Sequence, residues 1–245
     1  MPHRVVIIPA HHEPETVGAV AAAVPDCLEA DVLVLDDGGN GVLGELPPRV
    51  QVLEVPGQGS TGNGAVVRFG LAAALDRGAQ EIYRLDGDGQ HDPRYLPAAA
   101  EALHHGADVV IGSRFHPSSP APAPGPVDRL LLTESMRHLV HQLTGLQLTD
   151  VISGFWALRA ELAGELLPHL TTTGYGLTLE LLCRAAHAGA AIAEIPHPQI
   201  YAGTARMTTK YASDQLTARC ARAGTYLAVL STVAADLGLT LGAAS

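Results

Sequence analysis

The chain has 245 residues, of which 47% are hydrophobic and 16% charged, so it can bury a substantial core. A formal net charge of −10 argues against non-specific binding to nucleic acid, because the surface as a whole repels phosphates. Three scattered cysteines without a CxxC pair argue against a disulfide framework or a zinc knuckle, and they favour a reducing, cytoplasmic location. The apolar run at the N-terminus is shorter than a signal peptide requires and is typical of a first strand.

Short apolar runs alternate with helical patterns through the first half of the chain. The runs resemble buried parallel strands and cover residues 5–8, 32–35, 50–55, 82–85 and 109–111. Helices are predicted between them, over residues 15–24, 63–77 and 93–105. This alternation predicts an α/β fold in which helices cover both faces of a mostly parallel sheet. Ligands of such sheets bind at the carboxyl ends of the strands.

The second half of the chain begins with a proline-rich segment, residues 116–126, which cannot be helical. Two interpretations of it stay open, a lid over an acceptor and a surface excursion. The elements predicted after it are a helix over 127–144, a strand near 155–158, a helix over 178–188, a strand near 192–195 and a helix from about residue 213. We expect a single domain whose second half completes a site begun by the first.

The strongest functional signal directly follows the predicted fourth strand. Asp86 and Asp88 are separated and followed by glycine, so both carboxylates can turn toward one point. Carboxylate oxygens suit a hard cation, Mg²⁺ or Mn²⁺, which in turn holds a diphosphate. Gln90 offers a further oxygen ligand. The alternative interpretation is an Asp-Gly turn at the surface.

Polar residues also follow the first and second predicted strands. Asp36 and Asp37 end the second strand and are suited to accept hydrogen bonds from a nucleobase or ribose, with a simple turn as the alternative. The segment from Pro9 to Glu13 ends the first strand and is placed to line the same pocket.

A different class of function is raised by residues 57–62, which match the G-x-G-x-x-G pattern of dinucleotide-binding proteins. Amides at the start of the following helix are suited to bind a pyrophosphate, so a dinucleotide-dependent oxidoreductase is an alternative. The match follows the third predicted strand, and this interpretation leaves Asp88 unexplained. No HExxH pattern accompanies the 12 histidines, and we expect no zinc site.

Taken in order, the motifs resemble the family 2 glycosyltransferases of GT-A type, most closely the polyprenol-phosphate sugar synthases such as dolichol-phosphate mannose synthase. The matching segments are residues 5–17, 32–39, 62–71, 85–93, 107–115, 143–159, 174–182 and 193–207. The resemblance implies a GT-A fold over residues 1–210, with a nucleotide-binding part (1–115), an acceptor part (116–210) and a C-terminal helical extension (211–245). It also implies an inverting, metal-dependent transfer of a sugar from a UDP- or GDP-sugar to polyprenyl phosphate.

The resemblance assigns roles to individual residues of this chain. The implied nucleotide pocket consists of Pro9, Glu13, Asp36 and Asp37, and the implied ligands of Mg²⁺ or Mn²⁺ are Asp86, Asp88 and Gln90. Three arginines are implied to face phosphates: Arg114, Arg129 and the late Arg206. Asp150 is implied to line the catalytic centre, either as the base for an acceptor hydroxyl or as a structural carboxylate at the following turn. Glu180 and Glu194 match family positions, and we expect them to support the fold.

The chain departs from the family pattern at several cationic positions. Asn63 stands where lysine is frequent, Trp156 where arginine is expected, and Arg206 where a lysine follows serine. These departures keep open a second acceptor class, a soluble hydroxyl compound such as a specialised metabolite.

The C-terminal segment, residues 223–244, is apolar apart from Asp236. We expect a packed or dimer-forming helix, with a membrane-surface segment and a spanning helix as the alternatives. A lipid-phosphate acceptor implies peripheral contact with a membrane from the cytoplasm, whereas a soluble acceptor does not.

Overall fold

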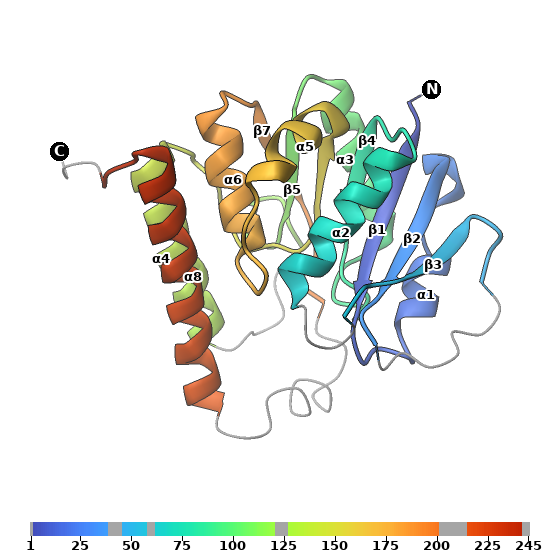
Figure 1. The fold of residues 1–245 in the computed structure, drawn as a ribbon, viewed down its shortest axis with the longest axis horizontal. Coiled ribbons are helices and arrows are strands. Elements are labelled where there is room, and N and C mark those ends of the chain that lie inside the picture. Colours follow the sequence, from blue (N-terminus) through green and yellow to red (C-terminus); the bar gives the residue numbers. More distant parts are fainter. Residues whose placement is uncertain (1, 39–45, 58–61, 121–126, 201–214, 242–245) are drawn as a thin grey trace.

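The computed structural model of the protein describes residues 2–38, 46–57, 62–120, 127–200 and 215–241. Its centre is a seven-stranded sheet in the order β3-β2-β1-β4-β6-β5-β7 (Figure 1). Six of these strands run parallel: β1 (Arg4–Ala10), β2 (Ala30–Asp36), β3 (Val50–Glu54), β4 (Glu81–Arg84), β5 (Val109–Ser113) and β7 (Ile192–Pro196). The remaining strand, β6 (Trp156–Arg159), is antiparallel to both of its neighbours, β4 and β5.

Helices cover both faces of this sheet. The α-helices of the described residues are α1 (Val17–Ala22), α2 (Asn63–Asp76), α3 (Leu96–His104), α4 (Val127–Thr144), α5 (Ala160–Leu166), α6 (Leu177–His187) and α8 (Gln215–Leu237). In β1, Val5 and Ile7 pack with α2, α5 and α6, whereas Val6 and Ile8 pack with α1 and α3 on the opposite face. Strands β1, β2 and β5 are therefore buried on both sides, which explains their continuous apolar sequences, whereas the edge strand β3 is largely exposed.

The predicted strands and helices are confirmed to within a few residues at their ends, and the following differences are the clearest. The first helix begins at Val17, two residues later than expected, and α5 was not predicted. Helix α5 follows β6 without a loop, and its seven residues are too few for a periodic pattern to stand out. Residues 121–126 of the proline-rich segment lie outside the described residues, so its two interpretations stay open.

The C-terminal helix α8 packs on the domain, beside α4 and α6 (Figure 1). Tyr226, Leu230 and Val233 form its buried face, at the spacing of one side of a helix. Asp236, the one charge in the apolar segment, pairs with Arg184 of α6 at 2.8 Å. The expected packed helix is thus confirmed, and no described helix is long and apolar enough to cross a membrane. The domain limits proposed from the sequence remain a prediction.

Candidate active site

The loop that follows β4 carries the two aspartates predicted to bind a cation. Asp86 pairs with Arg84, whose Nη2 lies 2.5 Å from Asp86 Oδ1. The Asp86 backbone N–H donates to His91 Nδ1 at 3.0 Å, so this ring nitrogen acts as the acceptor. Burial lowers the pKa of His91 to about 3, which keeps the imidazole neutral. One turn of the loop is closed by the Gln90 backbone N–H, which donates to Asp88 Oδ1 at 2.9 Å.

The ends of β1 and β2 meet this loop at the same edge of the sheet. The Gly87 backbone N–H donates to the Pro9 carbonyl at 3.3 Å, and a Cβ atom on Gly87 would lie 2.9 Å from Glu13 Oε2. The register between β1 and β2 aligns Ala10 with Asp36, and the Asp37 backbone N–H donates to the Ala10 carbonyl. The structure therefore brings Pro9, Glu13, Asp36 and Asp37 to the strand ends where the loop of residues 85–92, the predicted cation loop, begins.

The donor atoms of this loop fit a hard divalent cation. Asp86, Asp88 and Gln90 are all partly exposed, and they offer carboxylate and amide oxygens. In the part of the chain that the structure describes, no group of three or more histidine, cysteine, aspartate or glutamate side chains could hold a metal ion. Two carboxylates leave the remaining coordination positions to other oxygens, which is how Mg²⁺ is bound where substrate phosphates complete its shell.

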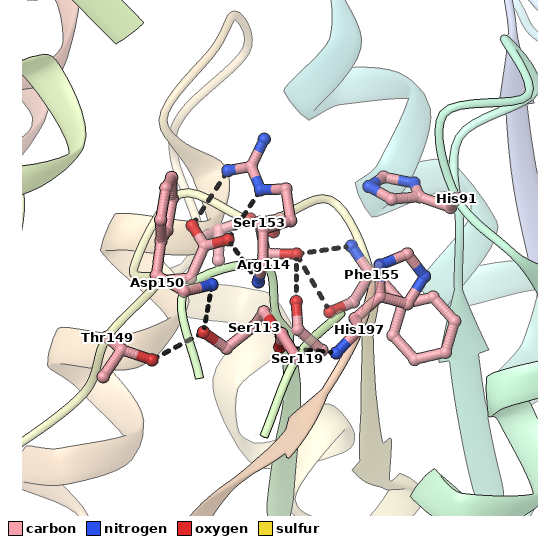
Figure 2. Close-up of polar contacts among 12 residues, drawn as sticks. His91, Ser113, Arg114, Ser119, Thr149, Asp150, Ser153, Phe155 and His197 are labelled. Atoms are coloured by element: carbon pink, nitrogen blue, oxygen red, sulfur yellow. Dashed lines mark hydrogen bonds and ion pairs between the residues drawn. The ribbon is translucent and has the colours of Figure 1, made fainter. Parts of the chain in front are cut away.

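A second polar cluster, drawn in Figure 2, is centred on Asp150. The side chain of Asp150 is fully buried. Arg114, directly after β5, approaches it with two arms: Nε lies 2.6 Å from Oδ2 and Nη2 lies 2.9 Å from Oδ1. Glu194 of β7 holds the other side of this segment, because its carboxylate accepts the backbone N–H groups of Thr149 and Asp150 at 2.8 to 2.9 Å. The expected structural role of Glu194 is thus confirmed.

The segment after Asp150 connects the two clusters. A Cβ atom on Gly154 would lie 2.3 Å from Asp86 Oδ2 and 2.8 Å from His91 Cε1, so this glycine lies directly against the cation loop. The Ser153 hydroxyl donates to the Gly112 carbonyl at 2.8 Å and fixes the segment on β5. The Arg114–Asp150 pair and the predicted cation ligands consequently belong to one site.

Two residues that shape this site, Arg84 and His197, were not predicted from the sequence. Arg84 is buried in β4 and contacts Asn63 at 3.3 Å, and its guanidinium carbon lies 5.9 Å from the centre of the Trp156 ring. Arg84 thus places a positive charge between Asn63 and Trp156, the two positions where the family pattern has lysine and arginine. An arginine inside an otherwise apolar run was the available signal. His197, which follows β7, accepts the Asp92 backbone N–H at 3.1 Å and packs beside His91 (Figure 2).

The contacts described above do not include two of the arginines that were predicted to face phosphates. Arg129 lies in the first turn of α4, and Arg206 lies outside the described residues.

Comparison with known proteins identifies the family. Residues 5–167 match the model of the family described as Glycosyl transferase family 2. The chain belongs to this family. It is therefore a glycosyltransferase, and the oxidoreductase alternative is excluded.

Two curated relatives support this placement. The chain is 31% identical over 201 residues to the polyprenol monophosphomannose synthase of Mycolicibacterium smegmatis, a match that covers 78% of the chain and 75% of the relative. It is 32% identical over 202 residues to the undecaprenyl-phosphate mannosyltransferase of Micrococcus luteus, covering 78% and 80%. The chain also resembles the glucosyl-3-phosphoglycerate synthase of Mycobacterium tuberculosis, crystallised with Mn²⁺, UDP and phosphoglyceric acid. That structure has a TM-score of 0.64 at 18% identity and covers 95% of this chain and 78% of its own, which confirms the predicted GT-A fold.

The geometry of α2 explains why the dinucleotide pattern misleads in this glycosyltransferase. The pattern's residues 58–61 lie outside the described residues, but the start of the following helix is described. Its Gly64 and Ala65 backbone N–H groups donate to the carbonyls of Gly174 and Thr173, at 3.0 and 2.9 Å. A Cβ atom on Gly64 would lie 2.5 Å from the Thr172 carbonyl oxygen. This glycine therefore admits a neighbouring protein segment, and the helix amides that a pyrophosphate would need are already bonded.

Proposed function

We propose that the protein transfers a hexose, with inversion at the anomeric carbon, from a UDP- or GDP-sugar to polyprenyl phosphate. Mannose is the first candidate sugar, because the names of both curated relatives describe mannosyl transfer to a polyprenyl phosphate. The single observation that carries the proposal is the joining of the acidic strand ends to the buried Arg114–Asp150 pair through Gly154. The proposed donor site and Arg114, the arginine proposed to contact an acceptor or donor phosphate, would then lie side by side.

The donor half of the site is assigned to the strand ends. Glu13, Asp36 and Asp37 are placed to accept hydrogen bonds from the nucleoside, as carboxylates at the ends of parallel strands do. Asp86, Asp88 and Gln90 would hold Mg²⁺ or Mn²⁺. Such a cation, when bound, neutralises the negative charge that develops on the departing diphosphate.

The acceptor half favours an ionised phosphate over a hydroxyl. Asp150 has no exposed surface, and both of its carboxylate oxygens accept from the Arg114 guanidinium. A carboxylate in that state is a poor general base, because it would have to give up a buried ion pair in order to bind a proton. A phosphate acceptor requires no base, since its second pKa is about 6. We therefore assign Asp150 to the positioning of Arg114, whose side chain is 18% exposed and can reach an acceptor or donor phosphate.

The reaction then follows from these positions. A phosphate oxygen of the acceptor forms a bond to the anomeric carbon, while the bond from that carbon to the diphosphate breaks and the diphosphate leaves with the electron pair. A polyprenyl acceptor resides in a membrane, so we also propose that the protein contacts the membrane surface peripherally from the cytoplasm. Self-association of the chain into a homodimer remains a prediction from the sequence.

The test is a transfer assay with labelled sugar nucleotides. GDP-mannose, UDP-glucose and UDP-galactose are incubated separately with the protein, Mg²⁺ or Mn²⁺ and a short polyprenyl phosphate, and the products are extracted into organic solvent. We expect label from one donor to enter the organic phase and to be released by mild acid. Label recovered in a water-soluble glycoside, with none in the lipid, would support the hydroxyl-acceptor alternative. Failure of every donor to label the lipid would overturn the proposed acceptor.

A further inference from the structure

Arg84 is a buried cation beside the proposed metal ligands. Its side chain is 6% exposed, and in the described part of the chain its one ion pair is with Asp86, at 2.5 Å. Asn63 Oδ1 accepts a second, longer hydrogen bond at 3.3 Å, and the Trp156 ring lies under the guanidinium. Arg84 Nε is buried without a hydrogen-bond partner among the described residues. The protein thus balances the charge of Arg84 chiefly through a carboxylate that is also assigned to the cation.

A divalent cation bound to this loop would interact with the same Asp86 carboxylate that pairs with Arg84. Arg84 contributes one fixed positive charge at this position. A divalent ion that draws on the same carboxylate adds two positive charges close to this fixed one. Repulsion between partly buried charges is screened much less than repulsion in water. The cation alone is therefore expected to bind weakly to this loop.

We infer that Arg84 makes cation binding depend on the nucleotide. Without nucleotide, Arg84 offsets the charge of Asp86, one of the two predicted carboxylate ligands, so the loop attracts Mg²⁺ or Mn²⁺ less strongly than two unpaired carboxylates would. A diphosphate supplies the negative charge that offsets Arg84, so cation and nucleotide bind together. Coupling of this kind is reciprocal: the cation raises the affinity for the nucleotide by the same factor as the nucleotide raises the affinity for the cation. Arg84 acts through Asp86 and is a positioning residue. The inference rests on the cation site included in the proposed function.

Mn²⁺ binding, measured without turnover, tests the inference. The signal of free Mn²⁺ in electron paramagnetic resonance gives its affinity for the wild-type protein and for Arg84→Met, alone and with saturating UDP or GDP. We expect Arg84→Met to bind Mn²⁺ alone about tenfold or more tightly than the wild type, because one nearby positive charge has been removed. The enhancement of Mn²⁺ affinity by the nucleotide should fall by the same factor.

Two variants separate charge from structure. Arg84→Lys keeps the positive charge and should bind Mn²⁺ alone as weakly as the wild type. Arg4→Met is the matched control, because Arg4 also forms a largely buried ion pair in the sheet, with Glu81, but at the opposite ends of the strands. Its Mn²⁺ affinity should equal that of the wild type. If Arg84→Met does not fold, Arg84→Gln removes the same charge and keeps a hydrogen-bond donor toward Asp86.

The outcomes distinguish this inference from the proposed function. Unchanged or weaker binding of Mn²⁺ alone by the folded neutral variant, with nucleotide-dependent binding intact in the wild type, overturns the role of Arg84 and leaves the cation site standing. If the wild type transfers sugar to lipid but binds no Mn²⁺ even with nucleotide, the cation site and the role of Arg84 both fail, and the transferase assignment stands.

Discussion

Arg114 and Asp150 are 36 positions apart in the chain and form a two-armed ion pair with distances of 2.6 and 2.9 Å. The carboxylate is fully buried, and its own backbone N–H donates to Glu194. A planar guanidinium held by two parallel hydrogen bonds has a fixed orientation. Each partner therefore determines where the other points, and the exposed part of Arg114 is presented from a rigid base.

The variant Asp150→Asn should separate positioning from base catalysis. We expect the free energy of unfolding to fall by about 3 kcal/mol, because the partly buried Arg114 loses its charged partner. Misplacement of Arg114 should lower kcat/KM for polyprenyl phosphate by about 100-fold. The pH dependence of the remaining activity should keep its shape, since no proton passes through Asp150.

The control for Asp150→Asn is Asp108→Asn. Asp108 pairs with Arg159 at 3.4 Å, but both side chains are more than one-third exposed, so the variant should change the free energy of unfolding by less than about 1 kcal/mol. If Asp150→Asn abolishes the acidic limb of the pH profile, where an essential base becomes protonated, Asp150 is the base and the positioning role is wrong.

The variant Asp88→Asn should remove cation-dependent binding of the donor. The side chain keeps its size and can still accept the Gln90 N–H, whereas the negative charge that a hard cation requires is lost. We expect turnover to fall by about two orders of magnitude or more. The rise in melting temperature produced by Mn²⁺ with UDP or GDP should also disappear. If Asp88→Asn turns over at the wild-type rate and still depends on added metal, Asp88 is not a ligand of the cation.

The variant Gly154→Ala tests the contact that joins the two halves of the site. Its Cβ atom would lie 2.3 Å from Asp86 Oδ2, so the cation loop must shift, and transfer activity should fall by at least about 10-fold. Gly164→Ala is the matched control, because nothing lies within 4 Å of its added Cβ. Within helix α5 this change should raise the free energy of unfolding by about 0.5–1 kcal/mol and leave activity unchanged. Equal activities of the two variants would show that the contact is unimportant.

The buried imidazole of His197 should make the protein less stable in acid. Burial lowers the pKa of His197 to about 4, from 6.5 for the unperturbed side chain. Between these values the unfolded chain binds a proton that the folded protein does not, so the free energy of unfolding falls as the pH drops from about 6.5 to about 4. The slope contributed by this residue is at most about 1.4 kcal/mol per pH unit. Urea denaturation at several pH values should give a shallower slope for His197→Gln, and an unchanged slope would contradict the prediction.

The amino-acid sequence by itself determined the strands, most of the helices and the acidic strand ends. These features are local: a buried parallel strand requires a continuous apolar run, and Asp86-Gly87-Asp88 has the composition of a turn wherever it occurs. Their place at the carboxyl ends of parallel strands follows from the fold class, so the grouping of these residues in the proposed donor half could be predicted. The resemblance to the family added Arg114 and Asp150 as separate candidates.

Only the tertiary structure decided how these residues are paired. Strand β6 enters the sheet antiparallel between β4 and β5, and this insertion sets Gly154 against Asp86 and Trp156 beside Arg84. No local pattern specifies such a placement, because it depends on which strands become neighbours and in which register they pair. The pairing of the buried Asp150 with Arg114 forms only once distant segments have packed together. The same is true of the burial of Arg84, which strengthens the electrostatic effect of its charge.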